Sequence, residues 1–261
     1  FIAELGSNHG GDLQRAIARV QAAKVAGFEA VKVQCFDSTR MFRPGTFTKA
    51  KHFPCPIDWL PELSVLAHSL KMEFGATVCN IGMVESVAKH CDFLKVGSYE
   101  LLCHDLIEAC VQTGKPFILS TGMATLEEIK AAAAHLPEGG STLLHCVSLY
   151  PCPIEKANLA RIGRIRAAFF PRFKFGYSDH TANPDIISRA VREWGADVIE
   201  IHFDLQDHKG AEARHSLKPH GAELTILDCR VNGDGSDCPS EEEQEERKWR
   251  ASPKDGMRPY A

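Results

Sequence analysis

The sequence predicts a (β/α)8 barrel, the TIM-barrel architecture of the α/β class. Three observations lead there: short apolar runs alternate with amphipathic helical patterns, there are eight such runs, and most are continuously apolar. Continuous apolar runs are typical of parallel strands that helices cover on both faces. A doubly wound open sheet is the alternative, but no G-x-G-x-x-G turn follows the first predicted strand, where LGSNHGGD stands instead.

Each predicted element rests on local signals. The predicted strands are residues 1–5, 30–34, 73–77, 92–97, 116–120, 142–147, 174–178 and 197–203. The helical patterns between them are residues 12–27, 59–72, 83–91, 104–114, 125–136, 157–169 and 184–195. Several of these helices follow Asp or Thr and many end on Gly, which are common start and stop residues. Thr125 followed by Glu128 forms a capping box that opens the helix there.

Two segments depart from this alternation. Residues 35–58 form the longest connection, and a loop of that length is usually functional, as a lid or a binding loop. We predict a barrel domain over residues 1–220. Residues 221–261, rich in Gly, Glu and Pro, are predicted to be an extended tail that completes or covers the barrel.

Composition narrows the classes of function. A net charge of -4 over 261 residues gives no basic surface for nucleic acid or an anionic membrane. No segment approaches the roughly 20 apolar residues of a transmembrane helix. The ten cysteines include no C-x-x-C pair, which favours buried thiols in a reducing cytoplasm over disulfides or zinc fingers.

Polar residues gather where the predicted strands end, and in a barrel these ends converge on the face that carries chemistry. They are Glu4, Asn8, His9, Lys32, Gln34, Lys95, Ser98, Ser120, Thr121, Ser148, Tyr150, Ser178, Asp179, His180, Glu200 and His202. Because both faces of a barrel strand are covered, the ammonium groups of Lys32 and Lys95 must each find an anion. With the serine hydroxyls they favour a small substrate that carries a phosphate and a carboxylate. A Schiff-base lysine is the alternative.

His180 and His202 end neighbouring predicted strands, which lie about 4.8 Å apart. Two imidazoles with water and a substrate oxygen would form an open, Lewis-acidic site for a divalent metal. Local hydrogen bonding of each histidine is the alternative. Glu4 is the best carboxylate for proton transfer and Asp179 is its competitor. We expect Asp179 to hydrogen-bond a metal-binding imidazole.

Seven stretches follow one another along the chain: IAELGSNHGGDL, AGFEAVKVQCF, DFLKVGSYEL, PFILSTGMATLEEI, LLHCVSLYPCP, FGYSDHT and IEIHFDL. In this order they resemble motifs of the N-acetylneuraminate (sialic acid) synthases and their pseudaminic, legionaminic and spore-coat polysaccharide relatives. The resemblance covers about residues 1–220.

The resemblance implies a barrel that condenses phosphoenolpyruvate with an N-acetylmannosamine-like sugar to a nonulosonic acid, releasing phosphate by C–O cleavage. It implies that phosphoenolpyruvate is bound by Lys32, Lys95, Ser98, Ser120 and Ser178. His180 and His202 would hold Mn²⁺ or Mg²⁺. Glu4 would lie beside the reacting carbons, with Gln34 and Tyr150 near the sugar. A homodimer is the family expectation.

The chain departs from the family pattern in three ways. Glu212 stands near where the family has an aspartate that contacts the sugar, and Ser148 stands where some members have Asn. The 261 residues do not include the family's C-terminal antifreeze-like domain, and Arg247, Trp249 and Arg250 are candidate replacements for its contacts. Two other functions stay open: a synthase of another 3-deoxy-2-ketoaldonate from a different aldehyde, and a non-catalytic sugar-binding barrel in polysaccharide biosynthesis.

Overall fold

The computed structural model of the chain describes residues 1–37, 53–206, 210 and 212–230. Phe1–Cys229 form one compact unit. Most of the connection predicted to be a lid or a binding loop lies outside the described residues. So does the tail beyond residue 230, with Arg247, Trp249 and Arg250. No helix in the described ranges is long and apolar enough to cross a membrane.

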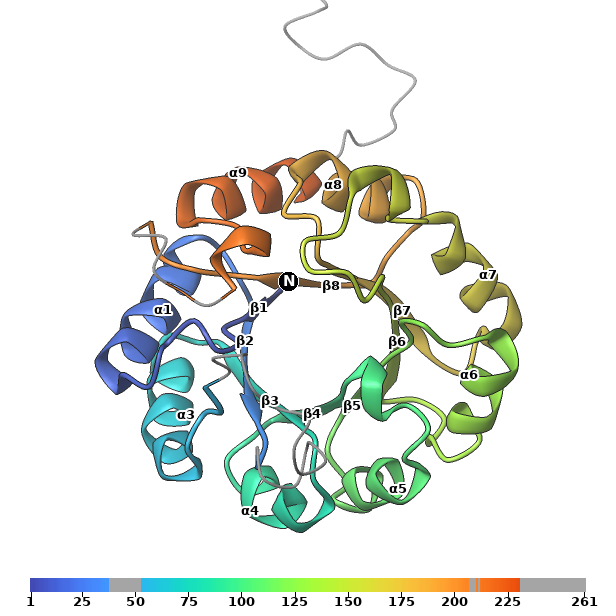
Figure 1. The fold of residues 1–261 in the computed structure, drawn as a ribbon, viewed down its shortest axis with the longest axis horizontal. Coiled ribbons are helices and arrows are strands. Elements are labelled where there is room, and N and C mark those ends of the chain that lie inside the picture. The colour runs from blue at the N-terminus through green and yellow to red at the C-terminus, as the bar shows by residue number, and fades with distance from the viewer. Residues whose placement is uncertain (38–52, 207–209, 211, 231–261) are drawn as a thin grey trace, which may run out of the picture. The chain divides into compact units, whose positions relative to one another are not determined.

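Eight parallel strands close into a barrel in which each strand pairs with the next and the eighth pairs with the first (Figure 1). They are β1 (Ile2–Glu4), β2 (Ala30–Cys35), β3 (Glu73–Val78), β4 (Phe93–Val96), β5 (Phe117–Ser120), β6 (Ser141–His145), β7 (Lys174–Asp179) and β8 (Val198–His202). The predicted (β/α)8 barrel is therefore confirmed.

Helices form the outer layer around the strands (Figure 1). They are α1 (Leu13–Val25), α3 (Leu60–Ser69), α4 (Val84–Ala88), α5 (His104–Gln112), α6 (Leu126–Ala133), α7 (Ala160–Phe169), α8 (Pro184–Arg192) and α9 (Pro219–Arg230). Short 3-10 turns are η1 (Ile57–Trp59), η2 (Ile81–Met83), η3 (Ser98–Glu100), η4 (Ile154–Lys156) and η5 (Ala213–His215). The capping box of Thr125 and Glu128 is present at the start of α6, as predicted.

Helix α9 corrects the predicted boundary of the barrel. The extended tail was expected from residue 221, but Pro219 opens a helix that continues to Arg230. Its residues Ala222, Thr225, Ile226 and Cys229 are buried at the spacing of one helix face. The exposed Leu224 and Leu227 and the buried Thr225 obscured this period in the sequence.

The inside of the barrel has an apolar floor, which consists of the inward-facing residues Ile2, Ala30, Gly75, Phe93, Ile118, Leu144, Gly176 and Val198. Six of these pack as one cluster, separate from the larger core between strands and helices. The two glycines leave room for their neighbours: a Cβ on Gly75 would lie 2.3 Å from the Phe93 ring, and one on Gly176 would lie 2.6 Å from Leu144 Cδ2. The floor closes one end of the barrel, so ligands must enter from the other end.

The segment after β8 is held to the barrel by the buried carboxylate of Asp204. Arg15 Nη2 lies 3.0 Å from Asp204 Oδ1, and Lys218 Nζ lies 3.4 Å from Asp204 Oδ2. Arg19 Nε lies 3.6 Å from Asp204 Oδ1, and the Gly210 N–H donates to Oδ2 at 3.2 Å. One carboxylate thus ties α1, the end of β8 and the start of α9 together.

We expect Asp204→Ala to lower the free energy of unfolding by about 3 kcal/mol, because the mutation leaves buried cations without their counter-charge. Thermal and urea denaturation measure this. The control is Glu85→Ala, since Glu85 pairs with Lys89 at 3.1 Å with its side chain 88% exposed. That change should cost less than about 0.5 kcal/mol. Equal stability of the two variants would contradict the assigned role of Asp204.

Candidate active site

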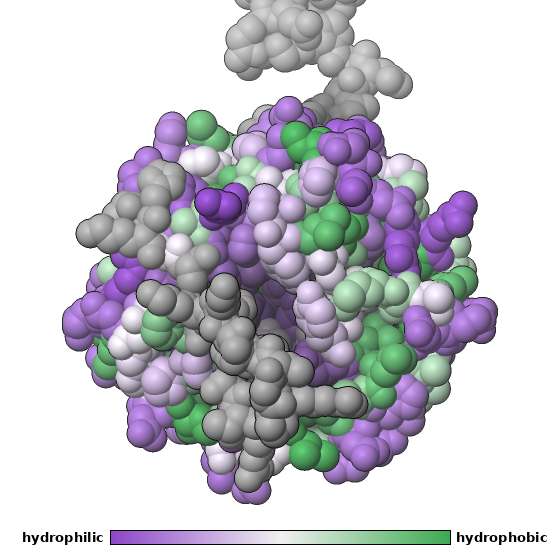
Figure 2. All heavy atoms as spheres, viewed as in Figure 1, coloured by the Kyte–Doolittle hydropathy of each residue, from purple (hydrophilic) through white to green (hydrophobic). Residues whose placement is uncertain are grey.

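A ring of mainly polar side chains lies directly above the floor. Each member follows a floor residue by two positions, so it points to the same inner side of its strand. This polar ring consists of Glu4, Lys32, Thr77, Lys95, Ser120, Cys146, Ser178 and Glu200, all of them buried. Figure 2 shows the hydrophilic hollow at the centre of the barrel.

Two lysines and two glutamates in the ring neutralise one another. Lys32 bonds to Glu4 and donates to Thr77 Oγ1 at 2.6 Å, and its Nζ lies 3.7 Å from Glu200 Oε2. Lys95 bonds to Glu200 Oε1, which also accepts from Ser178 Oγ at 2.9 Å. The expected anions for the lysines are therefore protein carboxylates. Glu200, to which no role was assigned from the sequence, is shared by both.

Burial and charge set the ionisation of this group. Burial raises the pKa of Glu200, but Lys32 and Lys95 lower it by more, so its pKa falls below the ordinary value. Burial lowers the pKa of Lys32 to about 8, against the opposing effect of Glu200. At neutral pH both side chains are charged, and Lys32 loses its proton at a lower pH than an ordinary lysine does.

His180 and His202 lie at the open end of the ring, with ring centroids 5.3 Å apart. His180 Nδ1 is 2.6 Å from the carbonyl oxygen of Val147, which can only accept, so Nδ1 carries the proton. Burial lowers the pKa of His180 to about 3, with a further contribution from His202, so the ring is neutral and its Nε2 has an available lone pair. The Tyr150 ring packs against the His180 ring, tilted by 36° and with its centroid 4.2 Å away.

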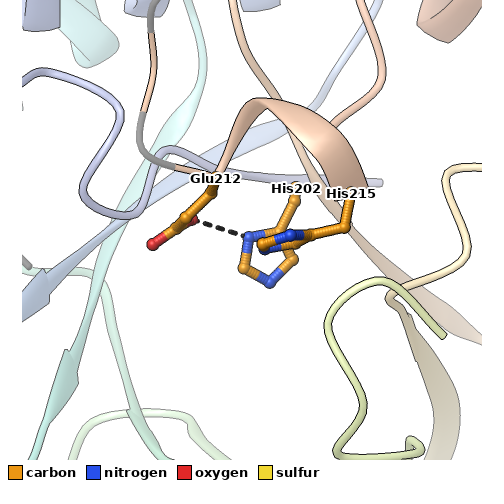
Figure 3. A group of neighbouring side chains, drawn as sticks. All are labelled: His202, Glu212 and His215. Atoms are coloured by element: carbon orange, nitrogen blue, oxygen red, sulfur yellow. Dashed lines mark hydrogen bonds and ion pairs between the residues drawn. The ribbon is translucent and has the colours of Figure 1, made fainter. Parts of the chain in front are cut away.

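Glu212 holds His202 in a similar way. Its Oε2 lies 2.9 Å from His202 Nδ1 (Figure 3). Its Oε1 accepts from the Ser7 N–H at 3.0 Å, and its own N–H donates to Asn8 Oδ1 at 2.7 Å. Burial raises the pKa of Glu212, but the hydrogen bond from His202 and the neighbouring charges bring it down to about 2. A fixed carboxylate on Nδ1 directs His202 Nε2 towards a ligand, as in many metal sites.

Two sets of side chains could hold a metal ion. The first is the Nε2 pair of His180 and His202. In the second, ligand atoms of His202, Glu212 and His215 all lie within 4.8 Å of one another (Figure 3). Imidazole and carboxylate donors suit a divalent transition metal in either case.

Two residues at this end of the barrel were missed by the sequence analysis. His215 lies in η5 with its ring centroid 4.7 Å from that of His202, and burial lowers its pKa to about 4. Glu100 lies in η3, and burial raises its pKa. The only signal for either was a position in a loop after a strand that carries site residues.

Three predicted serines lie at or next to the turn after β5. They are Ser98, Ser120 and Ser148. Ser98 Oγ accepts from the Gly122 N–H at 2.9 Å and lies 3.1 Å from Cys146 Sγ. The Oγ atoms of Ser120 and Ser148 are buried and have no hydrogen-bond partner within the described part of the chain. Buried hydroxyl groups without partners are typical of positions that a ligand completes.

Two further predicted residues are Gln34 and Asp179. Gln34 follows Lys32 by two positions on the same inner side of β2 and is partly buried. Asp179 does not contact a metal-binding imidazole, contrary to expectation: its carboxylate accepts from Thr181 Oγ1 at 2.7 Å and from the Ala182 N–H at 2.8 Å. Asp179 closes the turn after β7. Glu212 is the carboxylate that contacts an imidazole of the site, the role expected of Asp179.

Comparison with known proteins identifies the family. The model of the NeuB family matches residues 19–231. The chain belongs to the NeuB family. It is 32% identical to N,N'-diacetyllegionaminic acid synthase from Campylobacter jejuni, over 94% of this chain and 80% of that protein. Among solved structures, N-acetylneuraminic acid (sialic acid) synthetase from Leptospira borgpetersenii, in complex with citrate, superposes with a TM-score of 0.81 at 29% identity, covering 97% of this chain and 92% of that one.

The chain spans less than two thirds of some of its relatives. It is 31% identical to the spore coat polysaccharide biosynthesis protein SpsE from Bacillus subtilis, over 84% of this chain and 63% of that protein. The barrel of this NeuB-family chain is thus matched, while parts of longer relatives have no counterpart in these residues.

We expect His202→Ala to lower Mn²⁺ affinity at least about 100-fold, since both candidate ligand sets include His202. Isothermal titration calorimetry with Mn²⁺ alone measures this. His180→Ala should have a comparable effect, and His215→Ala should change the affinity less than about threefold, if the Nε2 pair holds the ion. The reverse order for these two variants would place the ion on the Nδ1 side of His202, with Glu212 and His215.

Proposed function

We propose that this NeuB-family protein condenses phosphoenolpyruvate with an N-acylamino sugar, of the N-acetylmannosamine type, to a nonulosonic acid and releases phosphate. The observation that carries the proposal is the juxtaposition, at one end of one barrel, of the paired lysines in the polar ring and the two oriented imidazoles. Related proteins are named as synthases of legionaminic, pseudaminic and sialic acids, which supports the reaction class.

Phosphoenolpyruvate would bind over the polar ring. Lys32 and Lys95 each carry three N–H bonds, so an ammonium that contacts a carboxylate still has protons to donate to a ligand. The hydroxyls of Ser98, Ser120 and Ser148 are uncharged donors beside them, and Ser178 would join them only by turning its hydroxyl proton away from Glu200 Oε1, to which it now donates. Because Glu4 and Glu200 already balance the two ammonium charges, the ring orients an anion through directed hydrogen bonds more than through excess positive charge.

A divalent metal, Mn²⁺ or Mg²⁺, fits the Nε2 atoms of His180 and His202, since Val147 O and Glu212 occupy both Nδ1 atoms. When bound, it would polarise the aldehyde of the sugar and stabilise the alkoxide that forms on attack by the enol carbon. Tyr150 lies against His180, where it can position the sugar ring together with Gln34. Ser7 and Asn8 hold Glu212 in place, and we propose that it orients His202. The family's aspartate near this position was expected to contact the sugar instead.

Glu4 is the proposed proton acceptor beside the reacting carbons. Its Oε1 accepts from the Gly6 N–H at 2.6 Å and its other oxygen contacts Lys32. After the enol carbon has attacked the aldehyde, water adds to the resulting cationic carbon and phosphate leaves. The proton that this water releases can pass to Glu4, while Lys32 stays close to the departing phosphate. We further propose that residues 1–230 form the synthase domain, which acts as a homodimer in the cytoplasm. The nine described cysteines are all unpaired, which agrees with a reducing compartment.

A phosphate-release assay with phosphoenolpyruvate and a panel of aldehydes tests this function. We expect release with N-acylated mannosamines in the presence of Mn²⁺, and loss of release with Lys95→Ala. Release with arabinose 5-phosphate alone would favour the synthase of another 3-deoxy-2-ketoaldonate. Binding of phosphoenolpyruvate without turnover of any sugar would favour a non-catalytic barrel.

We expect the affinity for phosphoenolpyruvate to fall as the pH rises through 8. Burial lowers the pKa of Lys32 to about 8, so above that pH the unliganded protein loses the ammonium that the anion requires. The loss should be roughly tenfold from pH 8 to pH 9.5, measured by calorimetry. The matched control, Lys32→Met, should bind more weakly and without this step. A constant affinity of the native protein over that range would contradict the role of Lys32.

A further inference from the structure

Cys146 occupies one position of the polar ring, and its thiol contacts a hydroxyl that the proposed function uses. Its Sγ lies 3.1 Å from Ser98 Oγ, and Ser98 Oγ also accepts from the Gly122 N–H at 2.9 Å. Cys146 is only 3% exposed, and Lys95 and Glu200 are close enough to influence the pKa of its thiol. The thiol is therefore enclosed among the groups that we assign to phosphoenolpyruvate.

The single proton of the Ser98 hydroxyl decides which of Ser98 and Cys146 can be the donor in their contact while Ser98 also binds a ligand. A hydroxyl has one proton and two acceptor positions. The Gly122 N–H fills one acceptor position, because an amide can only donate. If Ser98 donates its proton to Cys146 Sγ, none remains for a ligand. If Cys146 S–H donates to Ser98 Oγ, both acceptor positions are filled and the Ser98 proton is left for another acceptor.

An anionic ligand selects the second arrangement, because phosphate and carboxylate oxygens only accept hydrogen bonds from a hydroxyl. The thiol can donate only while it is protonated. Burial raises the pKa of Cys146, by more than the Ser98 contact and Lys95 lower it. The S–H bond is thus retained at neutral pH.

Packing around Gly122 fixes the geometry. A Cβ on Gly122 would lie 2.4 Å from Ser148 Oγ and 2.9 Å from both Cys146 Sγ and Ser98 Oγ. Three polar atoms therefore converge on the bare Cα of this glycine. Ser148 Oγ, and Ser120 Oγ on a residue that is 2% exposed, have no hydrogen-bond partner among the described residues. The convergence and the unpaired hydroxyls both indicate a place where a ligand accepts hydrogen bonds.

We propose that Cys146 is a positioning residue, whose thiol donates to Ser98 Oγ and so directs the Ser98 hydroxyl proton to the anionic substrate. This inference rests on the proposed function, since it takes phosphoenolpyruvate as the anion. It predicts that Cys146 acts only through Ser98.

A double-mutant cycle tests the inference with the native chain, Cys146→Ala, Cys146→Ser, Ser98→Ala and the Cys146→Ala/Ser98→Ala pair. Calorimetry with phosphoenolpyruvate gives the affinity of each, and phosphate release with Mn²⁺ separates KM from kcat. Cys146→Ala should weaken binding roughly tenfold and raise KM for phosphoenolpyruvate with little change in kcat. Cys146→Ser should bind as the native chain does, because a hydroxyl also donates. In the Ser98→Ala background, Cys146→Ala should cost nothing more.

Three outcomes would count against the proposal. Losses that add in the double variant would show that Cys146 acts independently of Ser98, through packing alone. Native affinity in Cys146→Ala would show that the thiol does not direct the hydroxyl. A native chain that does not bind phosphoenolpyruvate at all would overturn the proposed function itself, which separates that failure from the other two. Thermal melting of each variant checks that the barrel is intact.

Discussion

Two ammonium groups enclosed in a closed barrel are the constraint on which the rest of the structure depends. Lys32 and Lys95 project from strands that helices cover outside and neighbours flank on both sides, so the inside of the barrel must neutralise them. Glu4 and Glu200 do so from β1 and β8, which pair with each other and close the barrel. The apolar floor beneath keeps these charges at the open end, where a ligand can reach them. The polar site thus depends on closure of the sheet.

The histidine end of the site depends on a different kind of support. His202 ends a strand, but the carboxylate that orients it comes from Glu212, in the irregular segment between β8 and α9. That segment is held by Asn8, whose Oδ1 accepts from the Glu212 N–H, and by the ion pairs of Asp204 with Arg15 and Lys218. Residues near both ends of the barrel sequence therefore meet at one imidazole. Strands place the lysines, whereas a loop held by these contacts places Glu212, the partner of His202.

The sequence was sufficient for the barrel and for most of the polar ring, because both follow from regular patterns, but Thr77 and Cys146 were not among the predicted residues. Eight apolar runs with helices between them predict the strand order, and a period of two predicts which side chains share a face with Lys32 or His202. Irregular segments lack such a period, so the contact of Glu212 with His202 and the approach of His215 were not found. Asp179 was misassigned for a related reason: its neighbours in sequence, Thr181 and Ala182, satisfy its carboxylate before any imidazole can. Helix α9 was missed because Leu224 and Leu227 are exposed while Thr225 is buried, so apolar residues do not mark its buried face.

The two-residue step between floor and ring has a consequence for folding. If a strand paired one residue out of register, its floor and ring residues would turn to the helix layer, and a lysine or glutamate would lose its counter-charge in an apolar setting. Misaligned barrels are thereby penalised by the same four charges that prepare the site for a substrate. The four charges of the polar ring therefore also favour the correct alignment of the strands. The same residues serve both the chemistry and the assembly of the barrel.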